Sequence, residues 1–494
     1  MIPYDFHPGA IQRMNNKIST IALTLLMTGA IDSIRNLPAS AMFGSSLIFF
    51  FVLAAVIFLI PTALVSAHLA ANVDKGGVYD WVRLAFGEQY AFIAIWLQWI
   101  NSVIWFPTIF SFMVGTAAYL INPELAQNKV VLTAIILVSF WLLTLINLKG
   151  VQVSAKFTSF CTLIGLIIPI VFIIALLLVW LFLGKPLQIQ FNSASILPDW
   201  RHTDHWLALT AIISSFVGLE LSTVHIHAVK NPQKSFPRAL AYSTVIILVT
   251  MILGSLAIAV VLPNSQINLV NGTIQTYTYY LTAYHLSWLT PLLIILIVIG
   301  SLGGIISWII SPIIGLAQAA ENGFLPKMFS KKNKNDVPQN LLIAQAILVS
   351  TICLVFLLFP SVNASYWLLT ALSTQLYVIM YVLMFLAALR LYVDQQSNKD
   401  AFSVPGKKIG LGVVCWIGLI GCIISLIVGF IPPSNLDIGS GMYYETVFCG
   451  GLFAMIIPVI FFIMYQKQAD SSNQKRRPSK KLKRLKIETA AALD

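Results

Sequence analysis

Long apolar segments alternate with short polar segments along almost the whole chain. An α-helix needs about 20 predominantly apolar residues to cross the hydrocarbon core of a bilayer, and such runs rarely contain ionised side chains. The gaps between charged residues therefore predict twelve membrane-spanning helices. The predicted spans are 18–37, 43–70, 90–120, 130–148, 157–183, 205–227, 239–262, 286–318, 339–359, 364–389, 409–431 and 444–466.

The stretch 239–320 contains no Asp, Glu, Lys or Arg, so charge gaps cannot divide it. Within it, Pro263 is followed by Asn264, Ser265 and Gln266, and a polar, tyrosine-rich segment continues to Tyr284. Proline with small polar residues is typical of turns and loops. The pattern predicts a loop between the seventh and eighth spans.

Composition excludes an ordinary soluble protein. Of the 494 residues, 58% are hydrophobic and 10% are charged, whereas soluble domains have about 25% charged residues. The five cysteines lie in apolar segments without the paired spacing of a disulfide framework or a metal site. We therefore expect an all-α integral membrane protein. With no nucleophile motif, metal cluster or sizeable soluble domain in the sequence, we expect neither an enzyme nor a cofactor or metal ion.

The positive charges gather on one side of the predicted topology. With the N-terminal segment 1–17 in the cytoplasm, 26 of the 30 Lys and Arg residues lie in cytoplasmic segments, and Lys129, Lys185 and Arg201 lie outside. This bias follows the positive-inside rule and predicts that both termini are cytoplasmic. The net charge of +12 thus has a topological explanation, and no nucleic-acid partner is expected.

The tail 467–494 is polar and strongly basic, with eight Lys or Arg residues in 474–486. Basic side chains near an anionic membrane surface contribute about 1 kcal/mol each to membrane binding. We expect this cytoplasmic tail to contact anionic lipid headgroups.

Charged residues interrupt the interior of two predicted spans. Asp32 and Arg35 interrupt the first span near Gly29 and Pro38, and Glu220 interrupts the sixth. A charged side chain at the centre of a membrane costs about 2.5–3.5 kcal/mol on insertion scales, so such residues usually face a cavity or a partner. These charges are the candidates for a functional site.

The two interrupted spans occupy corresponding places in two halves of the chain. Five spans separate the start of the first unit from the start of the second, and an odd number reverses the orientation. Residues 18–184 and 205–393 would therefore be inverted repeats, with 409–466 outside the duplication. Interrupted segments at corresponding positions of inverted repeats indicate the binding site of a transporter.

The chain resembles the amino acid/polyamine/organocation transporter superfamily, and within it the branch of bacterial glutamate/GABA antiporters. The resemblance covers all twelve spans and is carried by the broken first span at Thr28–Pro38, by KGGVYDWVRLAFGE at 75–88, and by SFVGLE and KNPQKSFPRA at 215–220 and 230–239. It implies a LeuT-like five-plus-five inverted-repeat fold with helices 1 and 6 broken.

The resemblance also implies a function. It predicts a multi-pass antiporter of the bacterial inner membrane that moves amino acids or related amines by alternating access. A proton- or sodium-coupled symporter would share these motifs, and a membrane sensor or enzyme is the remote alternative. The oligomeric state does not follow from the sequence.

In this superfamily, backbone amides of the broken first span hold the substrate carboxylate. Here the stretch keeps one glycine and adds two charges, so the resemblance implies a site at Gly29, Ile31, Asp32, Ser33 and Arg35. An ionised Asp32 would repel an anion there. Either Arg35, its i+3 neighbour, neutralises Asp32 in a structural pair, or at least one of the two contacts substrate or a proton.

The sixth span supplies the remaining candidates. The resemblance places Phe216, Val217 and Gly218 at the site, with carbonyls suited to a substrate amine. Glu220 is interpreted as a proton-coupling or gating residue, with a structural hydrogen bond to broken backbone as the alternative.

Three polar or aromatic residues of the third span are further candidates. Trp99, Asn101 and Trp105 could line the cavity, although helix packing and membrane-interface anchoring explain them as well.

Overall fold

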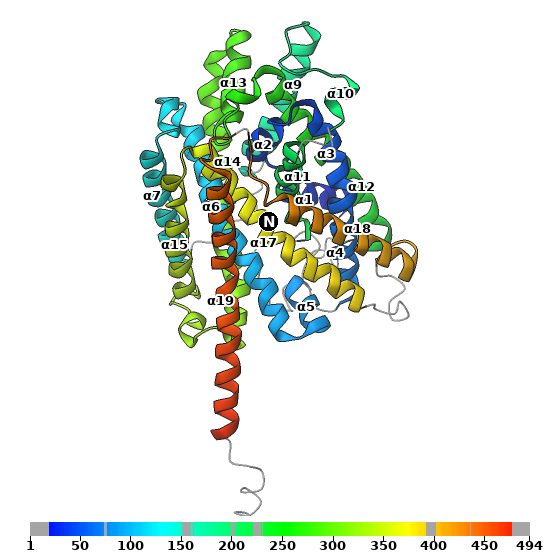
Figure 1. Ribbon diagram of the computed structural model, residues 1–494, viewed down its shortest axis with the longest axis vertical. Coiled ribbons are helices and arrows are strands. Elements are labelled where there is room, and N and C mark those ends of the chain that lie inside the picture. Colours follow the sequence, from blue (N-terminus) through cyan, green and yellow to red (C-terminus); the bar gives the residue numbers. More distant parts are fainter. Residues whose placement is uncertain are drawn as a thin grey trace, which may run out of the picture.

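The computed structural model describes residues 19–73, 77–150, 160–161, 163–198, 203–220, 229, 231–391, 402–434 and 436–476. Regular structure in these residues is helical (Figure 1). The first half contains α1 (Thr20–Ile31), α2 (Leu37–Ala41), α3 (Leu47–Ala54), α4 (Ile60–Asn72), α5 (Val78–Phe86), α6 (Glu88–Ala118), α7 (Lys129–Leu148), α9 (Ile168–Phe182), α10 (Ser193–Ile196) and α11 (Thr203–Phe216). The second contains α12 (Pro232–Val261), α13 (Gly272–Ala283), α14 (Thr290–Glu321), α15 (Gln339–Cys353), α16 (Val355–Leu358), α17 (Val362–Arg390), α18 (Lys407–Val428) and α19 (Gly441–Arg476).

Short 3-10 and π-helical pieces join or extend these helices. The 3-10 helices are η2 (Ile34–Asn36), η3 (Gly44–Ser46), η5 (Pro123–Ala126), η8 (Asn264–Gln266), η9 (Ser287–Leu289) and η10 (Lys327–Ser330), and the π-helices are η4 (Ala55–Leu59) and η6 (Leu163–Ile167).

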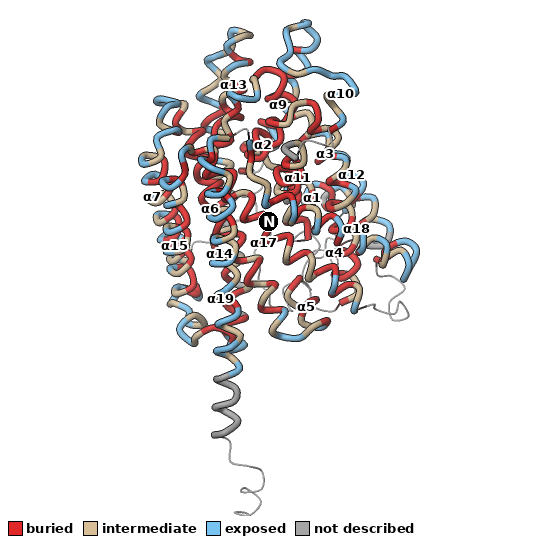
Figure 2. Tube along the Cα trace, viewed as in Figure 1, coloured by how far each residue is buried: buried red, intermediate tan, exposed pale blue. Residues whose placement is uncertain are grey.

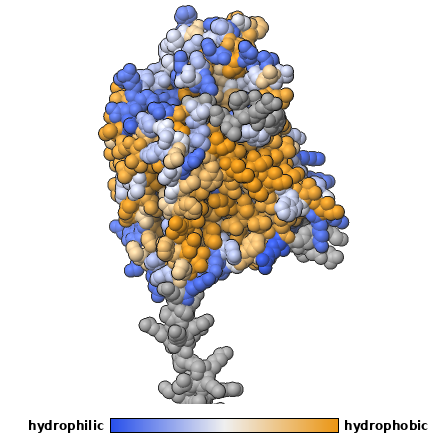
Figure 3. Space-filling view, in the orientation of Figure 1, coloured by the Kyte–Doolittle hydropathy of each residue, from blue (hydrophilic) through white to orange (hydrophobic). Residues whose placement is uncertain are grey.

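Nine helical segments of the described residues are long and apolar enough to cross a membrane. They are Gly44–Asn72, Glu88–Ala118, Lys129–Leu148, Leu163–Phe182, Lys234–Val261, Gln339–Leu358, Val362–Arg390, Lys407–Val428 and Gly441–Lys467. Each corresponds to a span predicted from the sequence. The surface carries a broad apolar band between two hydrophilic ends, as a bilayer requires (Figure 3).

The centre of the molecule is formed by α6 and α17, which pack against each other. In their most apolar stretches, 83% and 72% of the residues are buried, compared with 11% in α19 at the periphery. Buried residues run through the interior of the molecule, α6 and α17 included (Figure 2). Side chains that reach α6 or α17 therefore reach the interior of the protein rather than the lipid.

The segment between Pro263 and Tyr284 differs from the predicted loop. It contains η8 and the 12-residue helix α13, at the hydrophilic end opposite α5 (Figure 1). Its tyrosines and threonines have modest helix propensity, but Tyr277 and Tyr280 are fully buried. Tertiary packing, which a local sequence pattern does not reveal, stabilises this helix.

Most of the motif at 75–88 forms the short helix α5, in which apolar residues such as Trp81 are interspersed with the charged Asp80 and Arg83. Trp81 is fully buried, so its ring contacts protein rather than the membrane interface. The helix packs against both α6 and α17.

Two glycines allow a close approach of η6 and α14. A Cβ atom at Gly165 would lie 2.3 Å from the Cα of Gly300. This distance is too short for two carbon atoms, so a side chain at Gly165 would overpack the contact, which typically costs about 1–3 kcal/mol of folding stability.

We expect Gly165→Val to lower the thermal denaturation temperature of the detergent-purified protein. The control is Gly412→Val on α18, where an added Cβ meets nothing within 4 Å; equal denaturation temperatures for the two variants would contradict this packing.

Candidate functional site

The interruptions of the first and sixth predicted spans lie side by side. Helix α1 ends at Ile31, Asp32 and Ser33 are non-helical, and the chain continues through η2 into α2. Helix α11 ends at Phe216 and packs against η2 and α2. Both interruptions therefore open onto the same interior region, next to α6 and α17.

Arg35 is buried in a cage made by α6 and α17. Its Nη1 donates to Thr108 Oγ1 (2.7 Å) and lies 3.3 Å from Tyr366 Oη. The guanidinium also lies over the ring of Trp105, 5.4 Å from the centroid. Among the described residues, Nε has no hydrogen-bond partner and no carboxylate lies within ion-pair distance. Arg35 is thus a buried cation that still has N–H groups able to donate hydrogen bonds to a ligand.

Asp32 faces a different helix. Thr250 Oγ1 on α12 lies 2.8 Å from its Oδ2, but the single proton of this hydroxyl is shared with the carbonyl of Ile246 at 2.8 Å. The other oxygen, Oδ1, is buried without a hydrogen-bond partner in the described part of the chain. A buried carboxylate with so little compensation is costly unless another group binds it.

The two charges of the broken first span do not form the structural pair considered from their i+3 spacing. Asp32 contacts α12, whereas Arg35 contacts α6 and α17. No ion pair between them occurs among the described residues. The non-helical backbone at Asp32 and Ser33 removes the helical geometry that would bring i and i+3 side chains together.

Glu220 is held by two tyrosines of α17. Tyr377 Oη donates to Oε1 (2.6 Å) and Tyr381 Oη donates to Oε2. Gln98 Nε2 on α6 lies 3.4 Å from Oε1. The i, i+4 spacing of the tyrosines places both hydroxyls on one face of the helix, so they can hold the carboxyl group between them.

Gly218 links this cluster to the end of α11. Its φ of 102° is in the region that favours glycine, and its backbone N–H donates to Tyr381 Oη at 2.8 Å. The hydroxyl of Tyr381 therefore accepts from the broken backbone and donates to Glu220. Both interpretations of Glu220, proton coupling and a bond to the interruption, are compatible with this arrangement.

The other predicted site residues lie around the interruptions with different exposure. Gly29 is exposed within α1, Ile31 is buried at its end, and Ser33 is half-buried. The Asp32 amide donates to the Thr28 carbonyl (2.8 Å). This amide continues the helical bonding pattern, which leaves Ser33 as the first residue beyond it.

On the sixth span, Phe216 is fully buried and Val217 is half-buried. The ring of Phe216 lies 5.9 Å from that of Phe51 in an edge-on contact. This contact fixes the end of α11 against α3.

The third-span candidates divide into two roles. Trp105 contacts Arg35 and belongs to its cage. Asn101 Nδ2 donates to Ser373 at 2.7 Å, and Trp99 Nε1 donates to Gln345 at 3.0 Å. These two bonds fasten α6 to α17 and α15, as helix packing predicts.

Several residues of the site were missed by the sequence analysis. They are polar side chains on helices that read as ordinary spans: Gln98, Thr108, Thr250, Tyr366, Tyr377 and Tyr381. The sequence offers one signal that could have found some of them, because three tyrosines lie within the apolar helix α17.

The described residues contain no group of three or more His, Cys, Asp or Glu suited to a metal ion.

Fold and site together define a multi-pass helical membrane protein in which charged side chains are buried at two neighbouring interrupted helices. The profile of the amino acid permease family matches residues 18–464. The chain belongs to this family, which confirms its resemblance to the amino acid/polyamine/organocation superfamily.

Several proteins are similar over most of their length. An uncharacterized transporter of Legionella pneumophila is 38% identical over 453 residues, which cover 91% of this chain and 97% of the relative. A glutamate/gamma-aminobutyrate antiporter of Lactococcus lactis is 27% identical over 93% of both chains. A probable agmatine/putrescine antiporter of the same species is 25% identical over 80% of this chain and 84% of its own length.

Proposed function

We propose that the protein is a secondary active transporter that exchanges amino acids or related amines across the bacterial inner membrane by alternating access. The names of its relatives, a glutamate/gamma-aminobutyrate antiporter and a probable agmatine/putrescine antiporter, support this class of substrate. One observation carries the proposal: Asp32 and Arg35 are buried at an interrupted helix, and neither has an ion-pair partner among the described residues.

These two charges suit a substrate that carries both a carboxylate and an amine. A guanidinium is permanently charged and presents a planar set of donors that matches a carboxylate. Arg35 binds the substrate carboxylate, assisted by the backbone at Ser33, and Asp32 binds the amine, assisted by carbonyls at 216–218. A zwitterion thereby compensates two buried charges that otherwise lack partners.

Glu220 couples the site to protons or to gating. Its carboxyl group is 2% exposed and is bonded to α17 through two tyrosines. A change in its protonation alters the charge at the end of α11 and the bonds that join α11 to α17. This connects proton binding to the relative positions of helices that border the site.

The proposed architecture has twelve transmembrane helices. They form a five-plus-five inverted repeat, with α1 through η2 as the broken first helix and α11 as the first part of the broken sixth. The distribution of Lys and Arg supports two cytoplasmic termini, and in the proposed orientation α13 lies outside. Contact of the basic tail with anionic lipid stays a proposal from the sequence, because residues 477–494 lie outside the described residues.

Counterflow in proteoliposomes tests the function. We expect liposomes preloaded with an unlabelled substrate to take up labelled glutamate, γ-aminobutyrate, agmatine or putrescine without an ion gradient, and empty liposomes to take up little. Uptake into empty liposomes that requires a proton or sodium gradient would identify a symporter instead. Absence of flux with every amino acid and amine would overturn the proposal.

A further inference from the structure

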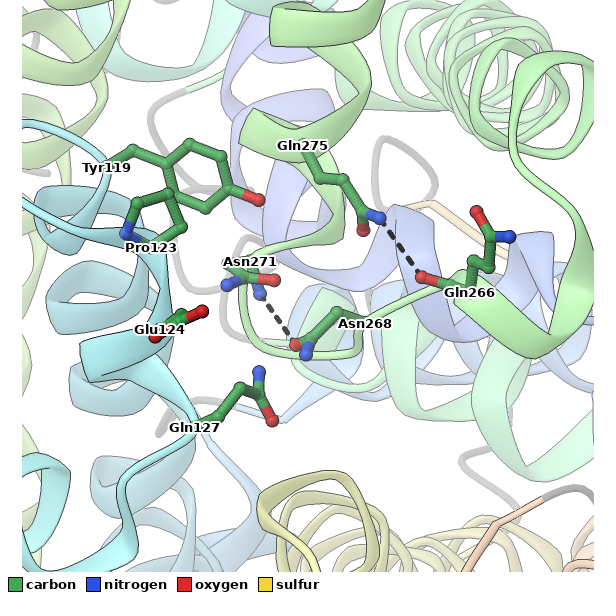
Figure 4. Close-up of a pocket in the computed structure, with 8 residues that line it drawn as sticks. All are labelled: Tyr119, Pro123, Glu124, Gln127, Gln266, Asn268, Asn271 and Gln275. Carbon is green, nitrogen blue, oxygen red and sulfur yellow. Dashed lines mark hydrogen bonds between the residues drawn. The ribbon is translucent and has the colours of Figure 1, made fainter.

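A polar cavity of about 230 Å³ lies at the end of the molecule that carries α13 (Figure 4). It lies between η5, at the end of α6, and the segment from η8 to α13. Five of its lining side chains are carboxamides, Gln127, Gln266, Asn268, Asn271 and Gln275. Its volume is below the roughly 300–1,000 Å³ of sites for drug-sized ligands, so it suits a small molecule.

Part of this lining is occupied by bonds that shape the wall. Asn268 Oδ1 accepts from the backbone amides of Val270 and Asn271 (2.9 and 3.2 Å). Gln275 Nε2 donates to the Gln266 carbonyl at 3.1 Å. These bonds fix the turn that leads into α13 and set the positions of the groups that remain.

The remaining groups include buried atoms without partners. Asn271 is 4% exposed, and its side-chain amide makes no hydrogen bond within the described residues. Gln275 Oε1 is also buried and unpartnered in the described part of the chain. Buried polar groups normally have partners, so the unpartnered Asn271 side chain in the wall of the cavity indicates a ligand that supplies a hydrogen bond.

The charge of the cavity specifies the kind of ligand. Glu124 is the acidic residue of the lining, and among the described residues its carboxylate has no hydrogen-bond or ion-pair partner. The nearby Lys129 is engaged elsewhere, because its Nζ donates to the Phe359 carbonyl at 3.0 Å. Tyr119 completes the wall. A phenol hydroxyl is neutral at physiological pH, so Glu124 supplies the charge of the cavity.

We propose that this cavity is a second ligand site, distinct from the central one, which binds the ammonium group of a small primary amine. Glu124 supplies the opposite charge, the carboxamide oxygens accept the remaining ammonium protons, and the Tyr119 ring borders the alkyl chain. The position of this cavity on the outer face of the membrane rests on the orientation given in the proposed function.

The cavity is connected to the broken first helix. Two residues beyond Asn271, Thr273 Oγ1 donates to the Ile34 carbonyl in η2 at 3.1 Å. At Gly272, an added Cβ would lie 3.0 Å from Pro38 in α2. Amine binding at the start of α13 therefore acts on the segment that carries Arg35.

Protection of an introduced cysteine tests this site in the full-length protein. Gln127 is exposed at the cavity, while Cys161, Cys353, Cys415 and Cys422 are buried and Cys449 is half-buried. In detergent-purified Gln127→Cys, we expect 1,4-diaminobutane to slow alkylation by a charged thiol reagent, beyond the wild-type background, and the neutral isostere 1,4-butanediol to have no effect. Equal effects of the two compounds would overturn the proposal.

Second substitutions in the Gln127→Cys background identify the charge. We expect Glu124→Gln to raise the half-protecting concentration of 1,4-diaminobutane about threefold, the usual effect of losing one contact with an exposed carboxylate. Glu124→Asp keeps the charge and should raise it less. Glu445→Gln, which changes an exposed glutamate outside the cavity, should leave it unchanged. An unchanged value in Glu124→Gln would reject the site.

A further variant separates this site from the central one. In Gln127→Cys with Asp32→Asn, which removes the proposed amine-binding charge of the central site, protection should persist even where exchange is lost; loss of protection would show that the amine acts through the central site. Alkylation by an impermeant reagent in intact cells, compared with inverted membranes, tests the face independently. Reaction only in inverted membranes would contradict the outer location and the orientation, but not amine binding.

Discussion

Arg35→Ala is expected to reduce the exchange rate in proteoliposomes about 100-fold at subsaturating substrate. Truncating one partner of a buried, hydrogen-bonded charge pair costs about 2–5 kcal/mol, and about 3 kcal/mol corresponds to that factor. The pair in question forms only when a substrate carboxylate binds, because Arg35 has no acidic partner among the described residues. Initial rates of labelled substrate counterflow measure the effect.

Two further variants show whether the guanidinium itself is required. Arg35→Lys keeps the charge but loses the planar set of donors, so its exchange rate should lie between those of Arg35→Ala and the wild type. Arg390→Ala, which removes an exposed arginine at the end of α17, should exchange at the wild-type rate. Arg35→Ala with more than half of the wild-type rate would reject a carboxylate-binding role.

The Arg35 substitution should not destabilise the protein. A buried charge without a counter-charge contributes little to stability, and its replacement by an uncharged residue is often neutral or stabilising. Equal or higher thermal denaturation temperatures for Arg35→Ala without substrate would separate a functional role from a structural one.

The interruptions and their charges could be predicted from the sequence because the membrane makes them conspicuous. Asp32, Arg35 and Glu220 lie in otherwise apolar segments, and an ionised group there needs a special environment. The same reasoning located nine spans that the structure contains as long apolar helices.

The partners of these charges could not be predicted because they depend on tertiary packing. Thr108 and Thr250 are unremarkable in apolar helices, where a threonine hydroxyl can bond its own backbone. Nothing in their sequence context shows that they face Arg35 and Asp32. The pairing of Asp32 with Arg35, one of the two alternatives considered, did not form for the same reason, since other helices supply the contacts.

Helix α13 shows the corresponding limit for fold prediction. Local composition around Tyr277 and Tyr280 favours a loop, but both rings are buried and their hydroxyls bond carbonyls of neighbouring helices. Only the assembled molecule shows that this segment is a packed helix. The cavity next to it was missed because its lining comes from segments more than 100 residues apart.

Glu220→Gln is expected to remove the pH dependence of exchange. Glutamine keeps the size of the side chain but has no proton to gain or lose, so its exchange rate should stay near the acid limb of the wild-type profile at every pH. The profile should flatten to within about twofold between about pH 5 and pH 8. Glu321→Gln, at an exposed glutamate at the end of α14, is the matched control and should retain the wild-type profile.

Substitutions of the tyrosines distinguish proton coupling from a purely structural role of Glu220. Tyr381→Phe removes a donor to the carboxylate and an acceptor for the Gly218 amide, whereas Tyr377→Phe removes a donor to the other oxygen. A hydrogen bond to a charged group contributes about 1.5–3 kcal/mol, and 1.36 kcal/mol corresponds to one pH unit. If Glu220 carries the proton, each variant should move the midpoint of the profile upwards by about one unit while the profile keeps its amplitude. The opposite outcome has two parts. Both tyrosine variants would exchange more slowly without a shift of the midpoint, and Glu220→Gln would keep the wild-type pH profile. Glu220 would then have only a structural role, as a hydrogen-bond partner of the interrupted helix.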